Sequence, residues 1–267
     1  MVAEAGPAQR LHVVTRKEEL DASLLRGKVV VVLDVLFATT SILAALAAGA
    51  REVIPVPDPE SARIAAQRFP PSQVLLAGEQ HLAPIPGFLG YSPLMLAAEP
   101  LDGKSLVYVT TNGTVALYRA QGASHVYAGS LRNGEALIKH LMESHRDETL
   151  LLVCASSAGS FSLEDFYGAG YLVDGLVSRA PGRWSPTDAA IAAQELYRAN
   201  RASPETLLLR SSLGRTLVSI DMRQDLLYVA QRGVEALIPV LRDGVFGRSE
   251  NRLYDTAKAA WPAVAPF

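Results

Sequence analysis

Runs of consecutive apolar residues recur along the chain, and polar or small residues follow each run. The clearest run, Val29 to Leu33, holds four valines and is typical of a strand buried on both faces. Similar runs predict strands at 11–15, 52–56, 74–77, 105–109, 125–127, 150–154 and 235–240. Helical patterns predict helices at 16–25, 42–50, 58–69, 94–98, 114–121, 133–144, 162–177, 188–199 and 224–231. This alternation predicts a three-layer α/β/α fold with a mostly parallel or mixed sheet.

One helix–strand unit occurs twice in the sequence. Ser41 to Val53 aligns without a gap with Thr114 to Val126, so that a hydroxyl, a Gly-Ala pair and a valine coincide. The segment 49–56 also resembles 233–240. Alanine-rich helices that end at glycine align easily with one another, so chance similarity and internal duplication both stay open. No segment resembles an interdomain linker, and we expect one domain over 1–267, with two similar halves that divide near residue 130 if the duplication is genuine.

Composition and charge exclude several classes of protein. Among 267 residues, 49% are apolar and 19% are charged, which are values of a globular protein. The net charge of -2 gives no electrostatic reason to expect nucleic acid or a membrane as partner. The single cysteine, Cys154, fits a reducing compartment, and no signal peptide or membrane span is recognisable. We therefore expect a cytoplasmic protein, whose size is compatible with a homodimer.

Acidic residues stand where several of the expected strands end. Asp34 and Glu79 follow apolar strands directly, and Glu164 and Asp165 begin the helix after a third strand. Ligands of open α/β sheets bind beyond the carboxyl ends of the strands, and carboxylates suit a hard cation such as Mg²⁺. Each acid also has a structural alternative: a turn cap for Asp34, a solvated position for Glu79, and a capping box with Ser162 for Asp165.

Hydroxyl and amide side chains gather at two of the expected helix starts. Thr39, Thr40 and Ser41 precede one helix, and the sequence TTNGT (110–114) precedes another. Hydroxyls and backbone N–H groups at a helix start can hold an oxyanion, although ordinary N-cap turns use the same residues. The second segment is not a Walker A sequence, because no Gly-Lys pair follows. If the two strands are neighbours in the sheet, both loops face one crevice.

The histidines and the cysteine give weaker signals. No two of the five histidines have paired metal spacing. His81 lies in the proline- and glycine-rich loop 80–93, where it is either a proton donor or a plain surface residue. Cys154 lacks the following arginine that a cysteine phosphatase loop needs, so we expect a buried, unreactive thiol. Asp225 is either a helix cap or a further acid of the site.

Several segments together resemble the 2-phosphosulfolactate phosphatase family, also known as the ComB family. They are DVLFATTS (34–41) with AAGA (47–50), AGE (77–79), IPGFLGYSP (85–93), TTNGT (110–114) and CASSAGSFSLED (154–165) with GAG (168–170). The likeness covers roughly residues 30 to 175 and continues in RQDLLYVAQRGVEALIPV (223–240). It implies a ComB-like α/β fold and a Mg²⁺-dependent phosphatase of coenzyme M biosynthesis. The implied substrate is a small phosphorylated organic acid, 2-phosphosulfolactate, which is hydrolysed to sulfolactate and phosphate.

The resemblance also implies roles for individual residues. Asp34 and Glu164 are expected to be catalytic, and Asp34, Glu79 and Asp165 to hold Mg²⁺. One of these acids either positions water or attacks phosphorus directly, and both routes stay open. The expected substrate contacts are Thr39, Thr40, Asn112, Gly113, Thr114 and Ser160.

Three positions depart from the family pattern. Phe37 and Gln80 stand where arginine is usual, and Leu89-Gly90-Tyr91 lacks the acidic residue of the family loop. Because arginine is a natural bidentate partner for sulfonate and phosphate, these changes leave an alternative open. The alternative is a substrate-shifted or catalytically inert anion-binding member of the same fold. A phosphatase of the haloacid dehalogenase type is disfavoured, since it needs a second aspartate where Leu36 stands.

Overall fold

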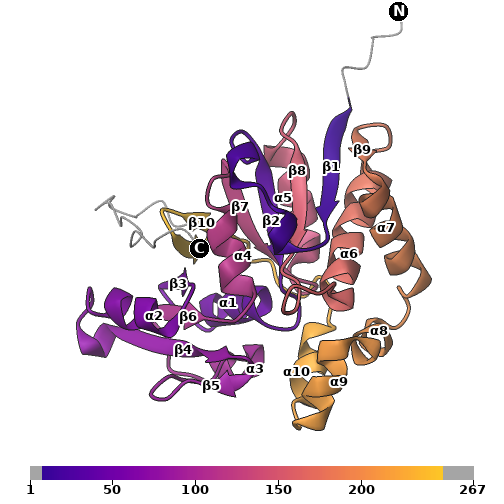
Figure 1. The fold of residues 1–267 in the computed structure, drawn as a ribbon. Coiled ribbons are helices and arrows are strands. Elements are labelled where there is room, and N and C mark those ends of the chain that lie inside the picture. Colours follow the sequence, from indigo (N-terminus) through magenta and orange to yellow (C-terminus); the bar gives the residue numbers. More distant parts are fainter. Residues whose placement is uncertain (1–7, 249–267) are drawn as a thin grey trace, which may run out of the picture.

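The computed structural model describes residues 8–248, and the rest of the expected domain 1–267 lies outside the described residues (Figure 1). Its strands are β1 (Gln9–Val14), β2 (Val29–Leu33), β3 (Glu52–Val56), β4 (Val74–Gln80), β5 (Ala83–Pro84), β6 (Ser105–Val109), β7 (His125–Gly129), β8 (Leu150–Cys154), β9 (Trp184–Pro186), β10 (Pro239–Arg242) and β11 (Val245–Arg248). Its α-helices are α1 (Ala38–Ala47), α2 (Pro59–Ala66), α3 (Pro93–Ala97), α4 (Gly113–Ala120), α5 (Gly134–Ser144), α6 (Leu163–Arg179), α7 (Asp188–Ala199), α8 (Pro204–Arg210), α9 (Ser212–Ser219) and α10 (Arg223–Val229). Three 3₁₀ turns are η1 (Lys17–Glu19), η2 (Ala22–Leu24) and η3 (Pro71–Gln73).

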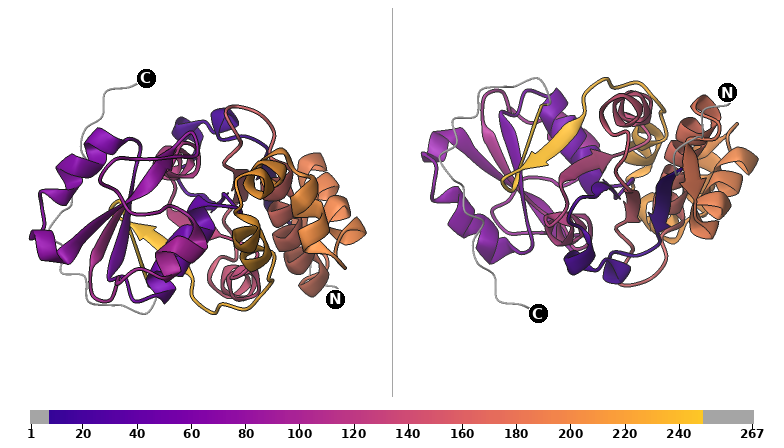
Figure 2. Two further views of the ribbon diagram at one scale, coloured as in Figure 1. Left: turned by 90° about the horizontal axis from the view of Figure 1, so that it is seen from below. Right: turned by 90° about the horizontal axis from the view of Figure 1, so that it is seen from above.

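The strands form one mixed sheet in the order β5-β4-β6-β3-β11-β10-β7-β2-β8-β1-β9. Strands β7, β2, β8, β1 and β9 are parallel to one another, as are β4, β6 and β3. The antiparallel hairpin β10–β11 joins these two groups. In Figure 2 the two groups lie side by side, with α6 and α7 on the flank that is farthest from α2. The predicted α/β fold with a mixed sheet is confirmed.

The apolar run 29–33 forms β2, an inner strand of the larger group. All five side chains of β2 are buried, and the strand pairs in parallel with β7 on one side and β8 on the other. Strands β3, β6 and β8 are buried at every position in the same way. Successive side chains of a strand point to opposite faces of the sheet. Because other elements cover both faces here, every side chain of β2 is apolar.

The two similar sequence units cross over between the groups of strands. The first unit is β2–α1–β3 and the second is β6–α4–β7. Because β2 pairs with β7 and β6 pairs with β3, each unit contributes one strand to each group. The starts of α1 and α4 touch, since a Cβ added at Gly113 would lie 2.3 Å from the Cβ of Ala38. This arrangement is what a duplicated unit would give, and the duplication itself stays a prediction.

Some predicted elements differ from those observed. Residues 16–25 form the two 3₁₀ turns η1 and η2 instead of a helix, because Leu20 between them has an extended backbone. The expected strand at 235–240 begins only at Pro239, because the N–H of Glu235 donates to the carbonyl of Arg132. Strands β5, β9 and β11 and helices α8 and α9 have no counterpart among the predictions. No helix within residues 8–248 is long and apolar enough to cross a membrane.

Candidate active site

A pocket of about 210 Å³ lies where strands β2, β4, β6 and β8 end. All four acids that the sequence singles out lie in its wall, together with residues of three loops. The lining residues are Asp34, Phe37, Glu79, His81, Leu82, Thr111, Asn112, Ser156, Ser157, Ala158, Glu164, Asp165 and Leu213.

The crevice forms although its strands are not neighbours in the sheet. We expected a common crevice if β2 and β6 were neighbours in the sheet. They are not, because four strands separate them. In Figure 1, β4 runs across the molecule below the lower ends of β2 and β7. The two groups of strands therefore meet at an angle, and loops from both groups reach one pocket.

The acids of the pocket are buried and close enough to repel one another. Burial, followed by the charges of Glu79 and Glu164, raises the pKa of Asp34 to about 7. Burial also raises the pKa of Glu164. Burial first, and then the charges of Asp34 and Glu164, raise the pKa of Asp165 well above its usual range. The pocket thus concentrates more negative charge than its surroundings compensate.

Backbone donors hold two of these acids in place. The N–H of Val35 donates to Oδ1 of Asp165 at 2.8 Å, which ties the start of α6 to the loop after β2. Glu79 accepts from the N–H of Thr111 at 2.7 Å, from the Thr111 hydroxyl at 2.9 Å and from the N–H of Leu82 at 2.7 Å. These bonds orient the carboxylates before any ligand binds.

The donor set suits a hard divalent cation. Carboxylate oxygens are the ligands that Mg²⁺ prefers, and a cation among Asp34, Glu79 and Asp165 would offset the repulsion that raises the pKa of Asp34 and Asp165. The structural roles that the sequence left open for these acids, such as capping a helix, explain them only in part. Ser162 does cap α6, since its side chain accepts from the N–H of Asp165 at 3.2 Å, yet the carboxylate of Asp165 is used elsewhere.

Lys17 is a buried cation beside the pocket that the sequence did not indicate. Its Nζ donates to the carbonyl of Ala155 at 2.8 Å, to Oγ of Ser156 at 2.9 Å and to Oδ1 of Asn112 at 3.0 Å. The charge of Lys17 also lowers the pKa of Asp34, against the stronger effect of burial. Because Lys17 occupies the amide oxygen of Asn112, the NH₂ group of that side chain is left as the donor toward a ligand.

Most of the predicted substrate contacts lie outside the pocket. Thr39, Thr40 and Thr114 are fully buried, and their hydroxyls donate to the carbonyls of Asp34 at 2.9 Å, Val35 at 2.6 Å and Thr110 at 2.9 Å, respectively. These hydroxyls close the loops instead of facing a ligand.

The remaining three predicted contacts differ from one another. Ser160 is exposed and absent from the pocket lining. Gly113 lies against Asp34, because an added Cβ would lie 2.2 Å from the Oδ2 of that acid. Among the six, Asn112 lines the pocket, and contact of the others with substrate stays a prediction.

The backbone of the pocket is strained at four positions. Positive φ angles occur at His81 (53°), Leu82 (65°), Ser156 (62°) and Ala158 (48°), and all four residues line the pocket. Such angles are unfavourable for residues other than glycine and concentrate at ligand sites.

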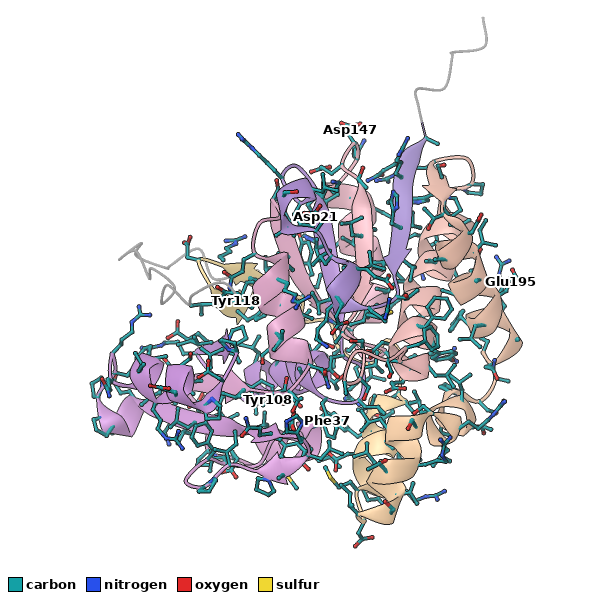
Figure 3. All side chains as sticks on the ribbon, in the orientation of Figure 1. Asp21, Phe37, Tyr108, Tyr118, Asp147 and Glu195 are labelled. Carbon is teal, nitrogen blue, oxygen red and sulfur yellow. The ribbon has the colours of Figure 1, made fainter. Side chains whose placement is uncertain are left out.

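Phe37 gives the pocket an apolar side. It precedes α1, is almost fully buried and packs edge-on against Tyr91 with 5.4 Å between the ring centroids. Figure 3 marks Phe37 near Tyr108, whose hydroxyl donates to the carbonyl of Tyr91. Gln80 is exposed and does not line the pocket. Of the two departures from arginine, only the one at Phe37 therefore changes the pocket wall.

Comparison with known proteins gives consistent matches over most of the chain. A family model described as 2-phosphosulpholactate phosphatase matches residues 14–244. A probable 2-phosphosulfolactate phosphatase of Symbiobacterium thermophilum is 40% identical over 225 residues, which cover 84% of this chain and 95% of the relative. Proteins of the same description from Carboxydothermus hydrogenoformans (85% and 92% covered) and Deinococcus radiodurans (81% and 88% covered) are 37% and 36% identical.

Proposed function

The chain belongs to the 2-phosphosulpholactate phosphatase family, and we propose that it is a Mg²⁺-dependent phosphatase that hydrolyses 2-phosphosulfolactate to sulfolactate and phosphate. The observation that carries this proposal is the convergence of four buried acids and two helix starts on one pocket. A phosphate monoester needs a counter-charge, a positioned nucleophile and a proton for the leaving group, and the pocket offers a residue for each.

The starts of α1 and α4 receive the phosphoryl group. Backbone N–H groups at a helix start carry partial positive charge, which favours a bound anion. Asn112 adds its NH₂ group as a donor, and Lys17 fixes this side chain by donating to its amide oxygen. Mg²⁺ bound by Asp34, Glu79 and Asp165 would neutralise part of the charge on the phosphoryl oxygens.

Two acids take part in the proton transfers and the attack. Asp34 lies at the end of β2 and against the start of α4, so its carboxylate can orient a water molecule or attack phosphorus itself. Glu164 holds a proton more tightly than an ordinary glutamate, because burial raises its pKa. We assign to Glu164 the donation of that proton to the leaving oxygen.

Phe37 favours a second candidate function. Its ring occupies a place in the pocket wall where a cation would suit the second anionic group of a sulfonated substrate. A member of the family with a shifted substrate, or one that binds an anion without turning it over, would account for this residue.

The wider setting of the protein belongs to the same proposal. We place the reaction in coenzyme M biosynthesis on the family relationship alone. The buried, free thiol of Cys154 supports a cytoplasmic location, and the net charge of -2 supports a small-molecule partner over nucleic acid or a membrane. A homodimer stays a prediction.

Phosphate release from a panel of phosphomonoesters, with Mg²⁺ or with EDTA, tests the proposal. We expect turnover of 2-phosphosulfolactate that EDTA abolishes and that Asp34→Asn lowers by about 100-fold or more. Asp225→Asn is the matched control, since Asp225 is equally buried but lies outside the pocket lining. Turnover of another ester only would indicate a shifted substrate. No turnover of any ester, together with measurable Mg²⁺ or phosphate binding, would establish the anion-binding alternative.

A further inference from the structure

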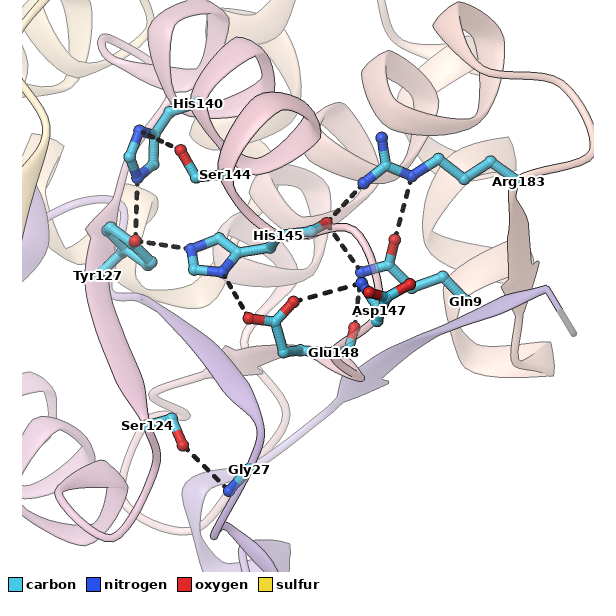
Figure 4. A network of polar contacts seen from close by, with 10 residues as sticks. All are labelled: Gln9, Gly27, Ser124, Tyr127, His140, Ser144, His145, Asp147, Glu148 and Arg183. Atoms are coloured by element: carbon cyan, nitrogen blue, oxygen red, sulfur yellow. Dashed lines mark hydrogen bonds and ion pairs between the residues drawn. The ribbon is translucent and has the colours of Figure 1, made fainter. Parts of the chain in front are cut away.

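A second cluster of metal-ligating side chains lies at the end of the sheet opposite the pocket, and Figure 4 shows two of its members, His145 and Glu148. His125 is the first residue of β7, His145 ends helix α5, and Glu148 stands two residues before β8. The pocket lies beyond the carboxyl ends of strands parallel to β7, so the length of a five-residue strand, roughly 15 Å, separates the two sites. One ligand atom from each of the three side chains lies within 4.8 Å of the other two.

The spacing of two of these atoms matches a tetrahedral metal site. Nδ1 of His145 and Oε1 of Glu148 are 3.2 Å apart in a hydrogen bond, which a metal ion between the two atoms would replace. Ligands that lie about 2.05 Å from a tetrahedral zinc ion are roughly 3.3 Å from each other. His125 is exposed and its ring centroid lies 4.7 Å from that of His145, so a small rotation of a free side chain completes the set.

The buried side chain of Tyr127 orients the ring of His145. The hydroxyl of Tyr127 lies 2.8 Å from Nε2 of His145 and 2.9 Å from Nε2 of His140. When Nδ1 of His145 faces a metal ion, its Nε2 carries the proton and donates to Tyr127, which donates in turn to His140. Metal-bound histidines ordinarily have such an outer partner, which fixes the tautomer and the direction of the ring.

The loop that carries two of the ligands is pinned independently of them. Gln9 donates to the carbonyls of His145 at 3.2 Å and Glu148 at 2.6 Å. Arg183 donates to the carbonyl of His145 at 2.5 Å and to that of Met142 at 2.8 Å. Figure 4 shows these side chains converging on the loop from β1 and from the segment before β9. The backbone that carries His145 and Glu148 is therefore held in place before an ion arrives.

We propose that His125, His145 and Glu148 bind a divalent transition-metal ion of the Zn²⁺ class. Two imidazoles and one carboxylate suit Zn²⁺ and disfavour Mg²⁺, which separates this site chemically from the acidic pocket. The exposed side of His125 leaves room for water as the fourth ligand. The bound ion joins β7, the end of α5 and the segment before β8, so it stabilises the folded chain.

Calorimetric titration of the full chain with Zn²⁺, in excess Mg²⁺ that fills the pocket, tests this site. We expect one Zn²⁺ per chain, a rise of the Tm on binding, and loss of this binding in His125→Ala and Glu148→Gln. Tyr127→Phe keeps all three ligands and should weaken binding by about 10- to 100-fold through the lost outer bond. His12→Asn, which changes a histidine outside the cluster, should bind as the wild type does.

Co²⁺ in place of Zn²⁺ gives a second readout. Visible absorption bands of four-coordinate Co²⁺ should be present in the wild type and in Asp34→Asn, and absent in His125→Ala. Because His125 is exposed, its replacement leaves the fold intact, as circular dichroism will check. Absence of Zn²⁺ binding by the wild type, or equal binding by His125→Ala, would overturn the assignment without bearing on the phosphatase pocket.

Discussion

Asp34 should make the folded protein less stable as the pH rises, if no metal ion is present. Burial and the charges of Glu79 and Glu164 raise the pKa of Asp34 from 3.8 to about 7. Between these values the folded state holds a proton that the unfolded state has lost, so the free energy of unfolding falls with rising pH. At 1.36 kcal/mol for each pH unit, this amounts to about 4 kcal/mol in all, and to roughly 2.3 kcal/mol between pH 5 and pH 7, since half of the folded molecules have lost the proton at pH 7.

Urea unfolding in EDTA at pH 5 and at pH 7 measures this effect. Asn has the shape of Asp but no titrating proton, so Asp34→Asn should remove about 2.3 kcal/mol from the fall that the wild type shows over this range. The comparison cancels contributions from the histidines, which titrate in both proteins. Mg²⁺ should remove from the wild type the part of the fall that Asp34 causes, because a bound cation stabilises the ionised acids. An equal fall in Asp34→Asn and wild type would refute the reasoning.

Three further predictions concern neighbouring residues. Lys17→Met removes a charged donor, worth about 1.5–3 kcal/mol per bond, and should lower kcat/KM by roughly 10- to 100-fold in steady-state phosphate-release assays; retained kcat/KM would contradict the role of Lys17. Gly113→Ala places a Cβ 2.2 Å from Oδ2 of Asp34 and should cost about 1–3 kcal/mol in urea unfolding as well as activity. Its control, Gly122→Ala, meets its nearest atom, the carbonyl oxygen of Ala22, at 3.3 Å and should leave activity unchanged, because that contact lies outside the pocket lining. Cys154 is fully buried and its pKa is raised well above its usual range, so a thiol reagent should modify it only after unfolding, as mass spectrometry can check.

The sequence predicted the acids of the site because their positions have a local signal. Asp34 and Glu79 stand at the ends of buried strands, where a charged side chain emerges from the core. The helix that carries Glu164 and Asp165 was also recognisable from its capping serine. Local information did not show that the strands would form two groups, and it is the angle between these groups that brings the four acids to one pocket.

Contacts between distant residues explain what the sequence did not predict. Lys17 lies in a short 3₁₀ turn, and its partners Asn112 and Ser156 are 95 and 139 residues away. The threonines at the helix starts are a different case, since their hydroxyls donate to carbonyls only four or five residues away. The sequence does not show whether such a hydroxyl closes its own loop or faces an anion. The hairpin β10–β11 exists through pairing with β7 and β3, which follows from the tertiary fold and not from its own sequence.

Phosphate release from 2-phosphosulfolactate, compared between the wild type and Glu164→Gln in saturating Mg²⁺, tests most directly whether the acidic pocket is the active site. Gln has the size of Glu but cannot supply a proton to the leaving oxygen. We predict turnover by the wild type and a kcat at least about 100-fold lower in the variant, with Mg²⁺ binding retained. Equal kcat values for the two proteins would show that hydrolysis does not use this pocket as proposed.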